Sequence, residues 1–479
     1  MPLTILSQSQ LRKLLLSLTR EEILELQRSL SEALREYSTG SQDQGCSATY
    51  QPQRTAITRS NGCTTLFMPA TTGKTLGIKM ISLQDGGTAG CAVERGGFDI
   101  PEGEPTSSRS RGGSVRNSVA SLSSEMSDLS VGSSHEDDSS ISPSVTTASS
   151  GGADSADSST LLTGCVNQLP VTEKVSSTLG AWPGAGTRDT SPRGNSLPFG
   201  LINAHELTAF RTALASLMLF NKRKKVRTLL VFGAGTQAYW HIRLALILRS
   251  NEIRRVYIVN RSFERAAELL RNIYLPENTE WRRDVKFSAM SSDFGEYNRI
   301  LKEHVRKADA IFCCTPSSTS LFPAEFLTSR EGRQKGRFLC AVGSYKKHMS
   351  EIHPDILRDE VNVTPPHRHF HKHTRRSGVI VVDSLDAAMK EAGEIIQAGV
   401  KPHQVVELGE LMMVRHAARK ASETDSVESA DEEKSLREWV ERGNVIYKSV
   451  GLGLMDLVTG GDLVRLARER GLGTTVEDF

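Results

Sequence analysis

An apolar run that ends in Gly-Ala-Gly is the feature that most constrains the fold of this chain. Residues 226–238 read VRTLLVFGAGTQA, and a second apolar run, VYIVNR, follows at residues 256–261. When a strand turns sharply into a helix, the free N–H groups of the helix can point at a pyrophosphate, and glycines permit that turn. We expect Gly233 to allow the turn, Gly235 to let the backbone approach the phosphates, and Ala238 to pack the helix on the sheet. The pattern indicates the first β-α-β unit of a dinucleotide-binding domain; the alternative is a glycine turn in an unrelated α/β fold.

The residues after the second apolar run indicate which cofactor such a domain would take. Chains that bind NAD usually carry Asp or Glu there, to hold the ribose 2′-hydroxyl. This chain carries the neutral Asn260, followed by Arg261 and Ser262. A carboxylate would repel a 2′-phosphate, whereas a guanidinium can bind one through two parallel N–H bonds. We therefore expect NADPH to be favoured over NADH; the alternative is that Arg261 is a solvated charge at a helix start.

Composition argues against several classes of protein. The 479 residues suffice for two or three domains, and the net charge of +3 is too balanced to predict a nucleic-acid or membrane partner. No apolar run reaches the roughly 20 residues that a membrane-spanning helix needs, and the first residues lack a basic segment followed by an apolar one. The seven cysteines show no C-x-x-C spacing, which favours reduced thiols and a cytoplasmic protein.

The spacing of apolar residues predicts the order of helices and strands. We expect two helices within residues 6–37, a strand-rich segment over 48–83, a helix over 205–220 and two helical stretches within 436–470. Between the last two, strands and helices alternate, which predicts a parallel, doubly wound sheet of the Rossmann type. The expected strands are 227–232, 255–259, 284–289, 309–314, 337–342 and 378–382; the expected helices are 237–249, 262–274, 295–306 and 385–398.

Polar segments interrupt this pattern. Residues 99–160 are dominated by serine, with glycine, aspartate and threonine, so they cannot bury enough apolar surface to fold. We expect a disordered insertion there, and an acidic mobile loop at residues 421–434. Residues 365–373 carry four alternate histidines, but the neighbouring Arg and Lys side chains would repel a metal ion. We interpret this tract as an exposed basic loop, with metal binding as the alternative.

Several separated motifs, taken in order, resemble the ornithine cyclodeaminase/μ-crystallin family. They are Arg54-Thr55, Met68-Pro69-Ala70, Lys79 within LGIKMISL, Leu207 to Ala213, Gly233 to Ala238, AIFCCTP at 310–316, Val342-Gly343-Ser344-Tyr345, Val382-Asp383-Ser384 and Ser449 within SVGLG. The order and approximate spacing match the family once both insertions are removed. The resemblance covers most of the chain.

This resemblance implies a homodimer in which both chain ends build a substrate-binding and dimerisation domain beside a Rossmann domain. Residues 1–98 and 161–220 would belong to the substrate domain, and residues 221–384 to the nucleotide-binding domain. Residues 385–479 would return as helices to the substrate domain. The expected fold is therefore α/β: a doubly wound parallel sheet plus a discontinuous α+β domain.

The family's chemistry moves a hydride between a nicotinamide ring and the α-carbon of an amino or imino acid. Such a substrate carries a carboxylate, which fixed cations can hold. The resemblance implies that Arg54 and Lys79 contact this carboxylate and act in catalysis, and that Arg211 lies between substrate and cofactor. Lys79 is also a candidate without the resemblance, because burying an ammonium within an apolar strand is costly unless it reaches water or faces a site. By itself, Arg211 could equally be a partly exposed helix residue.

Cofactor contacts are expected along the rim that the carboxyl ends of the parallel strands form. Thr315 and Pro316 end one apolar run, and Val342 and Ser344 end the next. The full expected set is Gly233, Gly235, Thr236, Gln237, Asn260, Arg261, Ser262, Thr315, Pro316, Val342, Ser344 and Ser449. The adjacent Cys313 and Cys314 are interpreted as core residues, and no metal ligands are expected.

One departure from the family pattern bears on the activity. Ornithine cyclodeaminases place an aspartate just after the glycines of the later strand end, where it handles the side-chain amine of the substrate. Here that position holds Tyr345, and no acid follows before Glu351. We therefore expect an NADPH-dependent reductase of a cyclic imino acid of proline or lysine metabolism. The alternatives are an ornithine cyclodeaminase that forms proline and ammonia, and a low-turnover binding protein of the crystallin type.

Overall fold

The computed structural model describes residues 2–39, 51, 54–60, 63–72, 75–84, 174–183, 198–362, 378–413 and 427–477. The expected serine-rich insertion at 99–160, the histidine-rich tract at 365–373 and the first part of the expected acidic loop lie outside these residues. The described residues form two sheets that share a hydrophobic core. None of the described helices is both long enough and apolar enough to span a bilayer.

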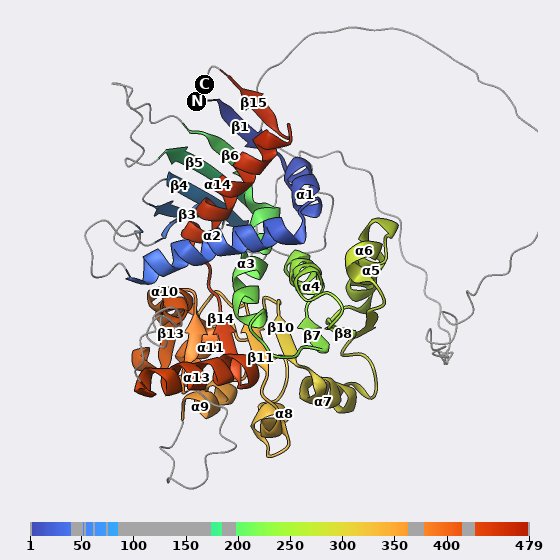
Figure 1. Ribbon diagram of the computed structural model, residues 1–479. Helices are drawn as coiled ribbons and strands as arrows, with labels where there is room; N and C mark the ends of the chain where they lie inside the picture. The colour runs from blue at the N-terminus through green and yellow to red at the C-terminus, as the bar shows by residue number, and fades with distance from the viewer. Residues whose placement is uncertain are drawn as a thin grey trace, which may run out of the picture. The chain divides into compact units, whose positions relative to one another are not determined.

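The first sheet has the strand order β15-β1-β6-β5-β4-β3-β2. β1 and β6 pair in parallel, and the other neighbours are antiparallel. Helix α14 lies across β3, β4 and β5, with α2 beside it (Figure 1). The strands are β1 (Leu3–Leu6), β2 (Thr55–Thr58), β3 (Cys63–Thr71), β4 (Thr75–Gln84), β5 (Lys174–Pro183), β6 (Gly200–Asn203) and β15 (Thr474–Val476); the helices are α1 (Gln8–Leu16), α2 (Arg20–Thr39) and α14 (Gly453–Glu469).

The alternating burial of side chains along β4 reflects a sheet that helices cover on one face. Lys79 faces the helices and is buried, whereas Leu76 and Met80 point to the opposite face and are exposed. Because successive strand residues face opposite sides, Lys79 enters the protein interior on the same face as Gly77, where a Cβ would meet Leu457 of α14. The strand-rich segment expected over 48–83 is confirmed as β2, β3 and β4.

The second sheet is parallel throughout, with the order β13-β12-β14-β11-β10-β7-β8-β9. The chain reverses its direction of travel across the sheet between β7 and β10, which creates a switch point where ligands bind in such folds. The strands are β7 (Thr228–Phe232), β8 (Arg255–Val259), β9 (Lys286–Met290), β10 (Ala310–Cys313), β11 (Phe338–Ala341), β12 (Ile380–Val382), β13 (Val405–Glu407) and β14 (Val445–Lys448).

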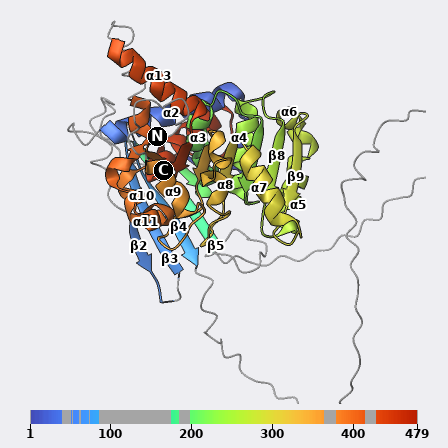
Figure 2. The ribbon, with the colours of Figure 1, turned by 90° about the horizontal axis from the view of Figure 1, so that it is seen from below.

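Helices cover both faces of the second sheet (Figure 2). In β7, Leu229 and Val231 face one core, and Leu230 and Phe232 face the other. This two-sided burial is why the parallel strands read as continuous apolar runs. The helices are α4 (Thr236–Leu248), α5 (Phe263–Ile273), α6 (Thr279–Arg282), α7 (Tyr297–Lys307), α8 (Glu325–Thr328), α9 (Pro354–Val361), α10 (Leu385–Glu391), α11 (Gly393–Ala398) and α13 (Val427–Arg442), with short 3-10 turns η1 (Pro276–Asn278), η2 (Gly332–Gln334) and η4 (Pro402–Gln404).

Helix α3 (Ala204–Phe220) links the two sheets and is buried on almost every side. It packs on β5 of the first sheet and on α4 of the second. At its end, the Phe220 ring lies 5.5 Å from the Phe312 ring of β10 and 6.2 Å from the Phe338 ring of β11. Because α3 is enclosed, its polar residues Glu206 and Arg211 need partners inside the protein.

The doubly wound fold is confirmed, but two expected boundaries need correction. Residues 385–479 do not only return to the first sheet, because β14 pairs between β11 and β12, and β13 extends the same parallel sheet. The expected boundary at residue 384 is therefore too early. The stretch expected as an acidic loop at 421–434 contributes, from Val427 onward, to helix α13.

Candidate functional site

The loop between β7 and α4 fits a dinucleotide. Gly233 has a φ of 106°, and a Cβ there would lie 2.7 Å from the carbonyl oxygen of Cys314. Gly235 is the N-cap of α4, no side chain caps this helix start, and a Cβ at Gly235 would meet nothing within 4 Å. Open space beside an uncapped helix N-terminus favours a phosphate group. The expected roles of Gly233, Gly235 and Thr236 fit this geometry.

The end of β8 carries an exposed arginine. The Asn260 amide donates to the Ser262 carbonyl oxygen at 2.7 Å. The Ser262 hydroxyl caps α5 by accepting from the Arg265 N–H, and it donates to the Glu264 carboxylate at 2.7 Å. Arg261 is exposed and makes no ion pair with any described residue. The guanidinium of Arg261 is therefore a group that can meet a 2′-phosphate, three positions before Glu264.

Three charged side chains meet under the first sheet. Asp456 of α14, which is fully buried, lies 2.7 Å from the Lys79 ammonium and 3.1 Å from the Arg211 guanidinium. Lys79 also donates to the Thr208 hydroxyl at 2.8 Å. Burial lowers the pKa of Lys79 to about 8, while the Asp456 carboxylate opposes that shift. We call Lys79, Arg211 and Asp456 the buried charge cluster.

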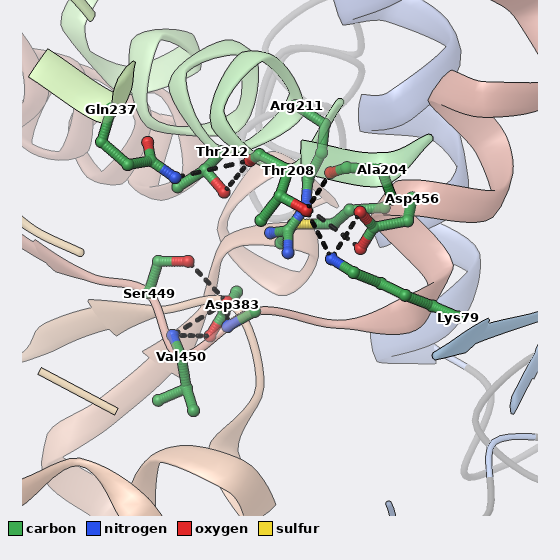
Figure 3. Close-up of polar contacts among 12 residues, drawn as sticks. Lys79, Ala204, Thr208, Arg211, Thr212, Gln237, Asp383, Ser449, Val450 and Asp456 are labelled. Atoms are coloured by element: carbon green, nitrogen blue, oxygen red, sulfur yellow. Dashed lines mark hydrogen bonds and ion pairs between the residues drawn. The ribbon is translucent and has the colours of Figure 1, made fainter. Parts of the chain in front are cut away.

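The buried charge cluster lies beside the glycine loop (Figure 3). The Gln237 side-chain amide of α4 is 3.5 Å from the Thr208 carbonyl oxygen, and the Thr208 hydroxyl is the group that accepts from Lys79. On the other side, a Cβ at Gly451 would lie 3.0 Å from an Arg211 guanidinium nitrogen. The cluster is thus held between the start of α4 and the segment that follows β14.

Arg54 lines a pocket and pairs with a carboxylate outside the buried charge cluster, although its charge also acts on Lys79. Its guanidinium lies 3.1 Å from the Glu391 carboxylate and 3.5 Å from the Gly451 carbonyl oxygen. Burial raises the pKa of Glu391, and the Arg54 charge opposes that shift. The pocket is lined by Tyr37, Gln51, Arg54, Met68, Pro69, Ser384, Asp386, Ala387, Lys390, Glu391, Gly451, Leu452 and Gly453. Arg54 is therefore placed to receive a carboxylate that replaces Glu391.

The ends of β10 and β11 are joined by a buried carboxylate. Glu351 accepts from the Thr315 N–H at 2.7 Å, from the Thr315 hydroxyl at 3.2 Å and from the Gly343 N–H at 2.7 Å. Burial raises the pKa of Glu351 to about 7, while Lys448 and the two N–H groups favour its charged form. At the same rim Pro316 is exposed and Val342 is partly buried.

Two of the expected cofactor residues have their hydroxyls committed inside the protein. Ser344 donates to the Glu394 carboxylate at 2.6 Å and accepts from the Lys448 ammonium at 2.6 Å. The Ser449 hydroxyl donates at 2.8 Å to Asp383, which also accepts from the backbone N–H of Val450 and Gly451. Both hydroxyls are therefore held by charged side chains of the chain itself.

Sequence reasoning identified the cations of the site but missed their partners. The structure brings Lys79 and Arg211 together. The Arg54 guanidinium lies near the Gly451 carbonyl oxygen, and Gly451 also borders Arg211. The sequence did not reveal the partners of these cations, Asp456 and Glu391, nor the contacts of Glu351, Glu394 and Lys448 at the neighbouring strand ends. A signal existed for Asp456 in LMDLV and for Glu394 in AGEII, because an acid in an apolar helix is as costly as a lysine in an apolar strand.

The cysteines of β10 and β11 are poor candidates for nucleophiles. Burial raises the pKa of Cys313 and Cys314 well above the usual value and that of Cys340 to about 12, which keeps the three thiols protonated. No group of three or more His, Cys, Asp or Glu side chains among the described residues could hold a metal ion.

Comparisons with known proteins bear on the family and the fold of this chain. Residues 191–427 match the sequence model of the ornithine cyclodeaminase/mu-crystallin family. A Delta(1)-pyrroline-2-carboxylate reductase of Bacillus cereus is 26% identical over 287 residues, which are 58% of this chain and 70% of that protein.

Two solved structures share the fold. An archaeal alanine dehydrogenase dimer with bound NAD has a TM-score of 0.57 at 14% identity, covering 100% of both chains. The Delta(1)-pyrroline-2-carboxylate reductase of Thermococcus litoralis, in complex with NADH and L-proline, has a TM-score of 0.56 at 16% identity, covering 99% of this chain and 100% of that one. With its glycine loop, its two sheets and the order of its motifs, this chain belongs to the ornithine cyclodeaminase/mu-crystallin family.

Proposed function

We propose that this chain is an NADPH-dependent oxidoreductase that reduces the C=N bond of a cyclic imino acid. The observation that carries the proposal is the buried charge cluster beside the start of α4. Two buried cations with one buried carboxylate leave a net positive charge where a hydride-transfer substrate would bring its own carboxylate. The similarity to proteins named as pyrroline-2-carboxylate reductases supports this substrate class.

The cofactor preference rests on the end of β8. Arg261 is exposed and free of ion pairs within the described part of the chain, whereas Asn260 and Ser262 make local hydrogen bonds. A guanidinium in this place suits the 2′-phosphate of NADPH. Glu264 weakens that attraction, so the preference for NADPH over NADH should be moderate.

The residues of the chain would bind the substrate and move one proton. When bound, a reduced nicotinamide supplies the hydride that the imine carbon accepts. Arg54 would exchange Glu391 for the substrate carboxylate, and Arg211 would add a second fixed positive charge. Lys79, with a pKa of about 8, can donate a proton to the substrate nitrogen near neutral pH, since general acids work best near the operating pH. Asp456 keeps Lys79 charged until that transfer.

A second candidate is an ornithine cyclodeaminase, and one observation favours it. The pocket around Arg54 contains the partly buried Glu391, which could accept a proton from an amine although the family aspartate is replaced by Tyr345. We prefer the reductase because Glu391 is already paired with Arg54 at 3.1 Å.

We also propose that the chain forms a homodimer through the face of the first sheet that no described helix covers. Four apolar side chains on this face are exposed by 37 to 54%: Ile57, Leu76, Met80 and Leu201. Exposed apolar patches of this kind mark interfaces between proteins. A fold neighbour described as a dimer supports this arrangement, and sedimentation of the full chain would measure it.

A cofactor-oxidation assay on the purified full chain tests the enzymatic proposal. NADPH and NADH would each be supplied with 1-pyrroline-2-carboxylate, 1-piperideine-2-carboxylate, or pyruvate plus an amine, and ornithine would be tested with NAD. We expect steady NADPH oxidation with at least one cyclic imino acid. Efficient conversion of ornithine to proline with no turnover of the imino acids would support the cyclodeaminase instead, and tight cofactor binding without any turnover would indicate a binding protein.

A further inference from the structure

The carboxylate of Glu351 cross-links two strand ends that border the expected nicotinamide site. One of its oxygens accepts from both the N–H and the hydroxyl of Thr315, which follows β10. The other oxygen accepts from the N–H of Gly343, which follows β11. Glu351 is fully buried, so no water competes for these donors.

Close backbone packing extends this link to the glycine loop. A Cβ at Gly343 would lie 2.0 Å from the Thr315 carbonyl oxygen, so the two strand ends are in direct contact. A Cβ at Gly233 would lie 2.7 Å from the Cys314 carbonyl oxygen and 3.2 Å from the Thr315 side chain. Thr315 is therefore in the middle of a stack, with the glycine loop on one side and Gly343 on the other. Any movement of Thr315 would disturb both.

The surroundings of Glu351 bear on whether its carboxylate is charged. Lys448 of β14 attracts the charge, and Glu394 of α11 repels it. The thiols of Cys313, Cys314 and Cys340 lie close enough to interact electrostatically with Glu351. Along its own chain, the next titratable side chain is His353, which lies 3.6 Å from Asp355. With a pKa raised to about 7, the carboxyl would take up a proton just below neutral pH.

Resting on the proposed function, we propose that Glu351 is a positioning residue that holds Thr315 and Gly343 in place for the nicotinamide half of the cofactor. Its contacts lie at β10 and β11, whereas the adenine half would contact the end of β8. Glu351 should therefore control the affinity for the complete dinucleotide and leave the affinity for the adenine half unchanged.

The Glu351→Gln variant separates these two affinities. A carboxamide has one acceptor oxygen and a donor NH₂, so it can satisfy only one strand end and turns a donor toward the other. Loss of a charged hydrogen-bond acceptor is expected to weaken NADPH binding about tenfold. Adenosine 2′,5′-bisphosphate, which has the adenine and the 2′-phosphate but no nicotinamide, should bind with less than about a twofold change.

The experiment measures both dissociation constants by calorimetry on the full chain. Glu331→Gln, an exposed carboxylate that pairs with Arg306 at 3.4 Å, serves as the matched control and should change neither constant. A second measurement needs no variant: in the wild type, the ratio of the NADPH constant to that of 2′-phosphoadenosine 5′-diphosphoribose should rise as the pH falls through about 7. Because both of these ligands carry the 2′-phosphate and a pyrophosphate esterified at both ends, the titration of their phosphates cancels in this ratio.

An unchanged NADPH affinity in Glu351→Gln, or an equal loss for both ligands, would overturn the positioning role. If the variant fails to fold, a flat wild-type ratio between pH 6 and 8 overturns it and a rising one supports it. Wild-type protein that binds neither ligand would overturn the proposed function together with this inference. Wild-type protein that binds both ligands but reduces no imine would overturn the proposed function alone.

Discussion

Replacing Asp456 by Asn removes the negative charge that two buried cations share. Lys79 is 1% exposed and Arg211 is 3% exposed, and both lie within 3.1 Å of the Asp456 carboxylate. The amide of Asn has nearly the same shape, so the change alters charge rather than packing. We expect the stability of the whole chain to fall.

The magnitude follows from what each cation can do once the carboxylate is gone. In the wild type the pKa of Lys79 is about 8, so at pH 7 its deprotonation costs only about 1.4 kcal/mol. Without Asp456 that pKa falls further, and Lys79 can lose its charge. Arg211 cannot deprotonate, so it remains a buried cation without a counterion. Breaking a buried pair in this way costs about 3 to 5 kcal/mol, and we expect a value near the lower end because Lys79 can neutralise itself.

Urea-induced unfolding, followed by the fluorescence of the buried Trp240, measures this loss. Glu303→Gln is the matched control, because Glu303 pairs with Lys307 on an exposed helix surface where the two charges remain solvated. That variant should unfold at the same urea concentration as the wild type, since exposed ion pairs contribute little.

The pH dependence of the stability loss in Asp456→Asn tests whether Lys79 contributes to it. A lysine whose folded-state pKa lies below its ordinary value binds fewer protons in the folded state, so its contribution to stability rises with pH through that window. In Asp456→Asn the window begins at lower pH than in the wild type. The stability gap between the two proteins should therefore shrink as the pH rises from 7 toward about 8 and stay constant above about 9. In a Lys79→Met background the gap should not depend on pH. Equal stability of Asp456→Asn and the wild type at pH 7 would refute the reasoning.

Two further variants test the ligand sites. Arg261→Ala should weaken NADPH binding by about tenfold to a hundredfold and leave NADH binding unchanged, as measured by fluorescence titration; equal weakening of both cofactors would contradict the assignment of Arg261 to the 2′-phosphate. Arg54→Ala should abolish turnover of the imino acid while NADPH affinity persists, because Arg54 lies in the pocket and not at the glycine loop. Arg59→Ala, an exposed arginine just after β2, is its control and should keep full turnover.

Most of the parallel sheet could be predicted from sequence because its central strands are buried on both faces. Such strands read as continuous apolar runs between helices, and the expected strand at 255–259 coincides with β8. Helix starts were equally visible where a side chain caps them, as Ser262 does for α5.

The strands that sequence reasoning missed are β1, β5, β6, β13, β14 and β15; all except the ten-residue β5 are short and depend on distant partners. β1, β14 and β15 have three or four residues each, too few to show a periodicity. β14 pairs with β11 on one side and with β12 on the other. Its sequence VIYK, which stands between two helices, does not reveal these distant partners. The expectation of two helices within 436–470 was therefore right about α13 and α14 and wrong about the strand between them.

In the site too, residues with a local sequence signal could be predicted, and residues whose role depends on distant packing could not. Lys79 could be recognised from its own strand, because a charge in an apolar run requires an explanation. Its counterion could not, since Asp456 is 377 positions away and reaches Lys79 only when α14 packs across β4. Glu351 was noticed only as the first acid after Tyr345, because its role depends on how closely two strand ends approach.

These partners change the chemistry expected of the site. Sequence alone suggested three cations converging on one substrate carboxylate, which would be strongly repulsive without ligand. In the structure, Arg54 is balanced by Glu391, and Asp456 balances one of the charges of Lys79 and Arg211. Below the pKa of Lys79 the buried charge cluster carries one net positive charge, enough for one carboxylate. Above that pKa the cluster becomes neutral, so the affinity for an anionic substrate should decline as the pH rises through about 8 while cofactor affinity, which depends on the glycine loop and Arg261, should not follow it.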